Sequence, residues 1–131
     1  MKYLLALLAF WPVVASAADL PMETVVLDAL DKVTGRVNTI RGPVGQTLPF
    51  GRLQIVARTC LTHPPEETPE NSAFLEIIEV QPKTKTQAES TKQIFIGWMF
   101  SSNPAISAMD HPVYDVWVLA CEPAKKPSSS R

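Results

Sequence analysis

The stretch GWMFSSNPAISAMDHPVYDVW, residues Gly97–Trp117, joins two apolar runs through a polar segment that prolines interrupt. The run that ends in it is Ile94–Phe100, and the run that begins in it is Val113–Cys121. Both runs are apolar at odd and at even positions, which is typical of strands that are covered on both faces. They are therefore predicted to be central strands of a sheet.

The polar segment between these runs has the pattern of a short helical turn. Asn103 is suited to the cap and Pro104 to the first helical position, and Pro112 ends the turn. Ile106 and Met109 are expected to share a face that packs on the sheet. The core also accounts for the neighbouring apolar residues, which are expected to be mostly buried: Trp98, Met99 and Phe100.

Outward from this stretch, short β-branched and apolar runs recur between turn residues, a spacing that is typical of all-β proteins. The expected strands are Thr24–Leu30, 33–38, Val44–Leu48, Arg52–Thr59, Ala73–Val80, Ile94–Phe100 and Val113–Cys121. Residues Gln81–Gln93 are expected to form a mobile hairpin loop. The sequence predicts an all-β fold, a small antiparallel barrel or sandwich of six to seven strands with one short helical crossover.

The N-terminus has the features of a secretory signal peptide. Lys2 precedes the apolar run Tyr3–Val14, and Ala15-Ser16-Ala17 offers a cleavage site after Ala17. As a helix the apolar run would rise only about 18 Å, too little for a membrane core of roughly 30 Å. We expect residues 1–17 to be the signal peptide, 18–23 a flexible lead-in, 24–121 a single β domain and 122–131 a disordered tail.

Charge and cysteine usage narrow the function classes. The formal net charge of −1 provides no basic field, so nucleic acid is not an expected partner. No transmembrane segment is expected after cleavage of the signal peptide. The chain has two cysteines, Cys60 and Cys121, which in an exported protein are expected to form a disulfide bond. A redox-active pair is disfavoured because CxxC spacing is absent.

Six polar residues of the crossover region are not needed by a core. They form the candidate binding surface: Ser101, Ser102, Asn103, Asp110, His111 and Tyr114. Connecting segments on a rigid β scaffold are common places for binding residues. A serine hydrolase is disfavoured because Asp110 and His111 are adjacent and no Gly-x-Ser-x-Gly motif is present. No catalytic residue is assigned.

The loop HPPEETPE, His63–Glu70, is expected to be exposed, acidic and stiffened by its prolines, and it is a second candidate interaction surface. His63 with Glu66 and Glu67, or His111 with Asp110, are the candidate metal ligands. His63 is expected to be a solvated residue whose replacement by alanine leaves folding and partner binding nearly unchanged. No metal site and no cofactor are assigned.

Several segments together resemble a known family. They are Leu30–Val37, Pro43–Ile55, RTC followed by PPEETPE, Ala73–Ile77, and GWMFSSNPAISAMDHPVYDVWVLAC. In this order they are similar to a family of small exported alphaproteobacterial proteins catalogued as a domain of unknown function, over about Val25 to Cys121. The resemblance implies a periplasmic location in a Gram-negative cell. It implies no activity, substrate or catalytic residue.

These observations lead to one expected function and one alternative. The expected function is a non-catalytic periplasmic binding or accessory module that interacts with an envelope protein. The alternative is a periplasmic protein that binds a small ligand or a metal at the corner formed by Asp110 and His111. A serine hydrolase is the third and least favoured interpretation.

Overall fold

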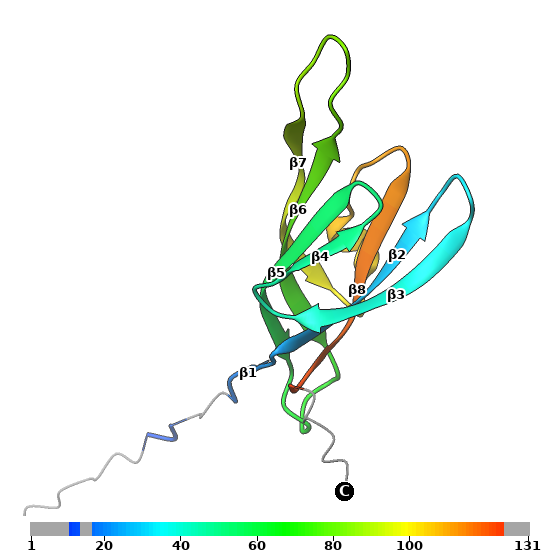
Figure 1. Ribbon diagram of the computed structural model, residues 1–131. Coiled ribbons are helices and arrows are strands. Elements are labelled where there is room, and N and C mark those ends of the chain that lie inside the picture. The colour runs from blue at the N-terminus through cyan, green and yellow to red at the C-terminus, as the bar shows by residue number, and fades with distance from the viewer. Residues whose placement is uncertain (1–10, 14–16, 125–131) are drawn as a thin grey trace, which may run out of the picture.

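The computed structural model describes residues 11–13 and 17–124. Most of the expected signal peptide, and the expected tail from residue 125 onward, lie outside the described residues. The described part contains one short 3-10 helix, η1 (Pro104–Ser107), and eight strands (Figure 1). The strands are β1 (Leu20–Pro21), β2 (Thr24–Asp31), β3 (Arg36–Pro43), β4 (Thr47–Phe50), β5 (Leu53–Thr62), β6 (Asn71–Gln81), β7 (Ser90–Phe100) and β8 (Tyr114–Glu122). No helix among the described residues is long and apolar enough to cross a membrane.

The strands form two antiparallel sheets. In the first, β5 pairs with β6 and β6 with β7, while β1 and β4 share the other edge of β5. In the second, β2 lies between β3 and β8. The prediction of an antiparallel all-β fold is confirmed. The described residues form eight strands instead of six or seven, in two separate sheets, so the closed barrel, one of the two expected architectures, is not formed.

The core consists of the inward-facing residues of both sheets. Alternate positions of β5, β6, β2 and β8 are fully buried because successive side chains of a strand point to opposite faces. Each large apolar side chain buried in this way stabilises the fold by about 1.5–3 kcal/mol. The largest fully buried residues are Leu27, Leu53, Ile55, Leu75, Ile77, Val25, Val116, Val118 and Cys60.

A disulfide bond joins the two sheets. Cys60 on β5 is bonded to Cys121 on β8, with their Cα atoms 5.6 Å apart and a separation of 61 positions in sequence. Closing a loop of this length stabilises a fold by about 4 kcal/mol in the chain-entropy model. The predicted pairing of the two cysteines is confirmed.

The predicted central position of the two apolar runs is wrong. β7 is an edge strand of the first sheet and β8 is an edge strand of the second. The outer face of β7 is apolar although no second layer covers it, since Ile96 is 52% and Trp98 39% exposed. The expected burial therefore holds for Met99 but not for Trp98.

Three turns lie a few residues away from their predicted positions. Val33 belongs to the turn between β2 and β3 and not to a strand. The short strand expected at Val44–Leu48 is β4, which includes Pro49. β6 and β7 pair as far as Gln81 and Ser90, so their hairpin loop is shorter than expected and the arm projects beyond the other strands (Figure 1).

Candidate functional site

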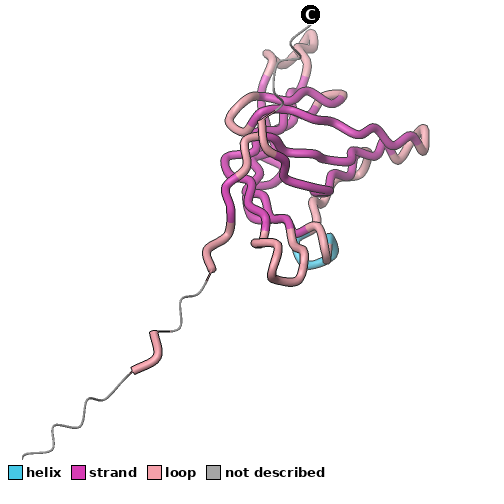
Figure 2. The backbone as a smooth tube through the Cα atoms, turned by 90° about the horizontal axis from the view of Figure 1, so that it is seen from below, coloured by secondary structure: helices cyan, strands magenta, loops and turns pink. Residues whose placement is uncertain are grey.

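The crossover, residues 101–113, connects the end of β7 to the start of β8 and contains η1. Figure 2 shows this helix at the periphery of the strand layers. Pro104 begins the helix as predicted, but Asn103 makes no side-chain cap hydrogen bond. Ile106 is 67% exposed whereas Met109 is buried in the core, so they do not share a face. The helix is a single turn, and the extended backbone of Ala108 ends the helical periodicity before Met109.

The first end of the crossover is held by the carboxylate of Glu70, the last residue of the proline-rich loop. Ser101 donates its hydroxyl to Glu70 Oε1 at 3.0 Å, and the backbone N–H of Ser102 donates to the same oxygen at 3.0 Å. The Ser102 hydroxyl donates to Oε2, and the backbone N–H of Asn71 donates to Oε1 at 3.0 Å. Four donors on one carboxylate tie the loop to the crossover.

These contacts also determine the direction of the Glu70 pKa. Partial burial of the carboxylate on its own would raise the pKa. The hydrogen bonds from Ser102, Ser101 and Asn71 favour the ionised form and outweigh burial, so the pKa of Glu70 lies below its ordinary value of 4.5. The carboxylate thus stabilises the native state while it is ionised.

The second end of the crossover is held by a buried pair. His111 and Glu79 are only 5% and 8% exposed, and His111 Nε2 is hydrogen-bonded to Glu79 Oε2. His111 Nδ1 accepts hydrogen bonds from the backbone N–H groups of Val113 at 3.0 Å and Tyr114 at 3.1 Å. Because Nδ1 is an acceptor, the ring proton lies on Nε2, which donates to Glu79. Arg52 lies 3.8 Å from the other Glu79 oxygen.

The surroundings of His111 fix the imidazole further. Tyr114 stacks on the ring with a centroid separation of 5.2 Å, and its own ring meets Phe50 edge-on at 5.5 Å. Lys32 donates to the backbone carbonyl of His111 at 2.7 Å. Since both ring nitrogens are engaged in hydrogen bonds within the fold, binding a metal at the Asp110–His111 corner would require this network to break.

The predicted site residues therefore divide between the two ends of β6. Ser101 and Ser102 lie at Glu70, before the start of the strand, whereas His111 lies at Glu79 near its end. The two glutamates are nine positions apart in extended chain, a span of roughly 30 Å. No Ser–His pair forms across this distance. Asn103 and Asp110 are exposed along the crossover between the ends.

Glu70 and Glu79 were not identified as site residues from the sequence, although the position of Glu79 in its strand is unusual for a charged residue. On β6, Leu75, Ile77 and Glu79 fall on the same alternating face, so a carboxylate continues an apolar row. A charged residue at such a position needs a buried partner. Which residue provides it, His111, follows only from the tertiary structure. Glu70 leaves no comparable signal, because the loop around it is acidic throughout.

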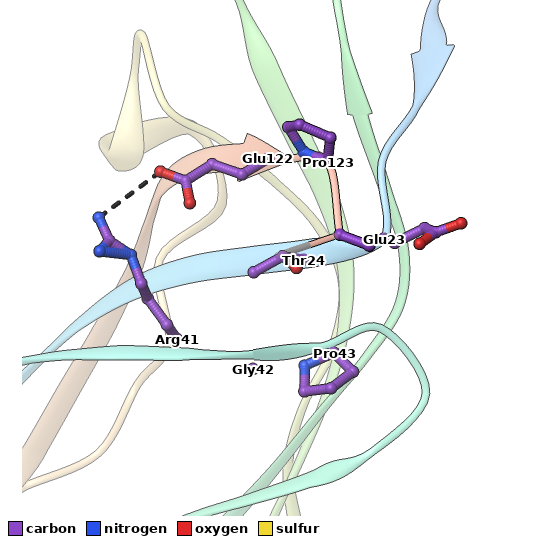
Figure 3. A pocket seen from close by; sticks show the side chains of 8 residues that line it. Glu23, Thr24, Arg41, Gly42, Pro43, Glu122 and Pro123 are labelled. Atoms are coloured by element: carbon purple, nitrogen blue, oxygen red, sulfur yellow. Dashed lines mark ion pairs between the residues drawn. The ribbon is translucent and has the colours of Figure 1, made fainter. Parts of the chain in front are cut away.

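A large open pocket of about 850 Å³ lies away from the crossover. It is lined by Glu23, Thr24, Arg41, Gly42, Pro43, Glu122, Pro123 and Ala124, where β2, β3 and β8 meet (Figure 3). Two of the lining residues, Arg41 and Glu122, form an ion pair at 3.5 Å (Figure 3). Because Glu122 neutralises Arg41 and Glu23 adds a further negative charge, the lining does not favour an anionic ligand.

The exposed apolar residues near the crossover form a different kind of surface. Ile96 and Trp98 point outward from β7, and Ile106 is exposed on η1, which lies beside β7. Trp98 packs edge-on against Phe74 of the neighbouring strand at 5.5 Å, which holds its ring in place. We call Ile96, Trp98 and Ile106 the β7–crossover face.

The chain belongs to the family described as "Uncharacterized protein conserved in bacteria (DUF2155)", whose model matches residues 25–121. The family inferred from the resemblance of its segments is therefore confirmed. The chain is similar to the "Uncharacterized protein RP359" of Rickettsia prowazekii (strain Madrid E), with 27% identity over 93 residues. This match covers 71% of the chain and 57% of the relative's length. No solved structure matches the chain.

Proposed function

We propose that this member of the family is a non-catalytic binding module of the bacterial envelope, which contacts an envelope protein through the β7–crossover face. The observation that carries the proposal is the exposure of Ile96, Trp98 and Ile106, at 52%, 39% and 67%, on adjacent elements. Apolar and aromatic residues that gather on a surface are typical of interaction sites. Tryptophan in particular is enriched among residues that dominate binding energy.

The shape of this face is set before a partner binds. Phe74 orients the ring of Trp98, and β7 is paired to β6 from Ser90 to Phe100 except at a bulge at Ile94. The crossover is fixed at one end by Glu70 and at the other by Glu79. A surface held in this way loses less conformational entropy when it docks than a mobile loop does. We also interpret the two facing sheets as a sandwich that serves as the rigid scaffold.

The location in the envelope rests on two features of the chain. The sequence of residues 1–17 predicts export, and the disulfide between Cys60 and Cys121 is of a kind that persists in oxidising compartments such as the periplasm. Both features support a partner that is itself an envelope protein. The engagement of both His111 nitrogens argues against the alternative, a ligand or metal site at Asp110 and His111.

Site-specific photo-crosslinking in the native cell tests the proposal. A photoreactive residue is placed at position 98, at position 106, and at position 33 as the matched control, because Val33 is also an exposed apolar residue, on the β2–β3 turn. We expect positions 98 and 106 to capture the same envelope protein and position 33 not to capture it. Failure of both test positions, or equal capture from position 33, would show that the face is wrongly assigned.

A further inference from the structure

Three residues with metal-binding side chains meet at the base of the proline-rich loop. Asp19, His63 and Glu67 each offer one ligand atom, and these atoms all lie within 4.8 Å of one another. His63 Nε2 is 3.7 Å from Asp19 Oδ1, and His63 Nδ1 is 3.9 Å from Glu67 Oε2. The sequence alone brings Glu66 and Glu67 close to His63. The structure adds Asp19, which lies 44 positions earlier in the chain.

We propose that Asp19, His63 and Glu67 bind a divalent late first-row metal ion, with Zn²⁺ as the reference ion. One imidazole and two carboxylates are a ligand set that Zn²⁺ accepts in proteins, and the remaining coordination position is left to water. The site is separate from the β7–crossover face, so it goes beyond the proposed function and does not depend on it.

One nitrogen of the His63 ring remains available to bind a metal ion. Nδ1 lies 2.8 Å from the backbone carbonyl oxygen of Thr68, to which it donates its proton. The lone pair of Nε2 is then free, and Asp19 lies on this side of the ring, whereas the Glu67 carboxylate lies 3.9 Å from Nδ1. Histidines that bind metals usually donate their other ring N–H to a carbonyl or carboxylate, which fixes the tautomer.

The backbone explains why these three residues meet. In β1, Leu20 pairs with Thr62, so the antiparallel register places Asp19 opposite His63. A turn in which Glu67 N–H donates to the Pro64 carbonyl at 3.0 Å brings Glu67 back toward His63. The His63 N–H closes the base of the loop by donating to the Glu70 carbonyl at 3.0 Å.

The charges around the imidazole also favour a cation. The hydrogen bond to the Thr68 carbonyl raises the pKa of His63, burial lowers it, and the nearby carboxylates of Asp19, Glu67 and Glu70 raise it. The same three carboxylates attract a metal ion.

Zinc titration of the exported protein, purified with its disulfide intact and freed of metal by a chelator, tests the inference. Isothermal calorimetry at pH 7.5 should show saturable binding of one Zn²⁺ per chain. His63→Ala, Asp19→Asn and Glu67→Gln should each weaken Zn²⁺ affinity at least about tenfold. Glu66→Gln is the matched control in the same loop, and it should stay within about twofold of wild type.

Two results would overturn the site. One is the absence of saturable Zn²⁺ binding by the wild-type protein, and the other is an equal loss of affinity in Glu66→Gln and Glu67→Gln, which would indicate diffuse attraction to an acidic loop. Circular dichroism of each variant verifies the fold. The ¹⁵N chemical shift of His63 Nε2 should move on zinc addition, and a shift at Nδ1 or at neither nitrogen would contradict the proposed ligation.

Discussion

The buried pair of His111 and Glu79 should be the most sensitive polar contact of the crossover. His111→Ala removes a hydrogen bond to a buried carboxylate, worth about 1.5–3 kcal/mol, and leaves the N–H groups of Val113 and Tyr114 without their acceptor, at about 0.5–1.5 kcal/mol each. Arg52 stays near Glu79, and water can reach the half-buried N–H groups. The expected loss of unfolding free energy is therefore about 3 kcal/mol, at the lower end of that sum.

Urea unfolding at pH 7, followed by tryptophan fluorescence with the disulfide intact, measures this loss from the transition midpoints. Asp110→Ala is the matched control, because Asp110 is the exposed neighbour of His111, and it should change stability by at most about 0.5 kcal/mol. Glu79→Gln should cost less than His111→Ala, since the amide oxygen still accepts from Nε2–H. If His111→Ala and Asp110→Ala were equally mild, the anchoring role assigned to His111 would be refuted.

Three further outcomes are expected. Glu70→Gln should lower the free energy of unfolding by about 1 kcal/mol at pH 7, because the ionised carboxylate with its lowered pKa is lost. The difference from wild type should disappear as the pH falls below 4.5 and through the folded-state pKa of Glu70, and a pH-independent difference in urea midpoints would contradict this. Replacing both cysteines by serine should lower the unfolding free energy by about 4 kcal/mol. The oxidised wild-type protein should resist thiol alkylation, and rapid labelling of the cysteines would count against the disulfide bond. Gly51→Ala should lower the free energy of unfolding in urea by about 2–3 kcal/mol, because a Cβ there would lie 2.5 Å from the Tyr114 hydroxyl at a φ of +55°. Gly35→Ala, with a φ of +72° and no atom within 4 Å of the new Cβ, has only the conformational cost of about 1 kcal/mol, and equal losses in the two variants would contradict the steric clash at Gly51.

The parts of the fold that follow from local sequence were predictable. The apolar alternation of β5 and β6 identifies them as strands with one face in the core, because side chains of a strand alternate between faces. The pairing of Cys60 with Cys121 follows from a count of two in a chain whose first residues predict export. These inferences need no knowledge of which strands are neighbours.

The parts that depend on distant neighbours were not predictable. An apolar outer face on β7 looks the same in sequence whether a second layer covers it or solvent does, and so its edge position was missed. Ser102 and His111 each lie 32 positions from the glutamate that they bind. β1 is a two-residue strand without a pattern of its own, yet its register is what brings Asp19 to His63.

We propose that the β7–crossover face binds an envelope protein. The most direct test is quantitative co-purification of the crosslinked partner with wild-type protein, Trp98→Ser, Ile96→Ser and the control Val33→Ser, after unfolding curves have verified that each variant is folded. We predict that recovery of the partner falls at least about tenfold with Trp98→Ser and Ile96→Ser, as for central residues of an interface, and is unchanged with Val33→Ser. Unchanged recovery with the two β7 variants, or an equal fall with Val33→Ser, would contradict the claim.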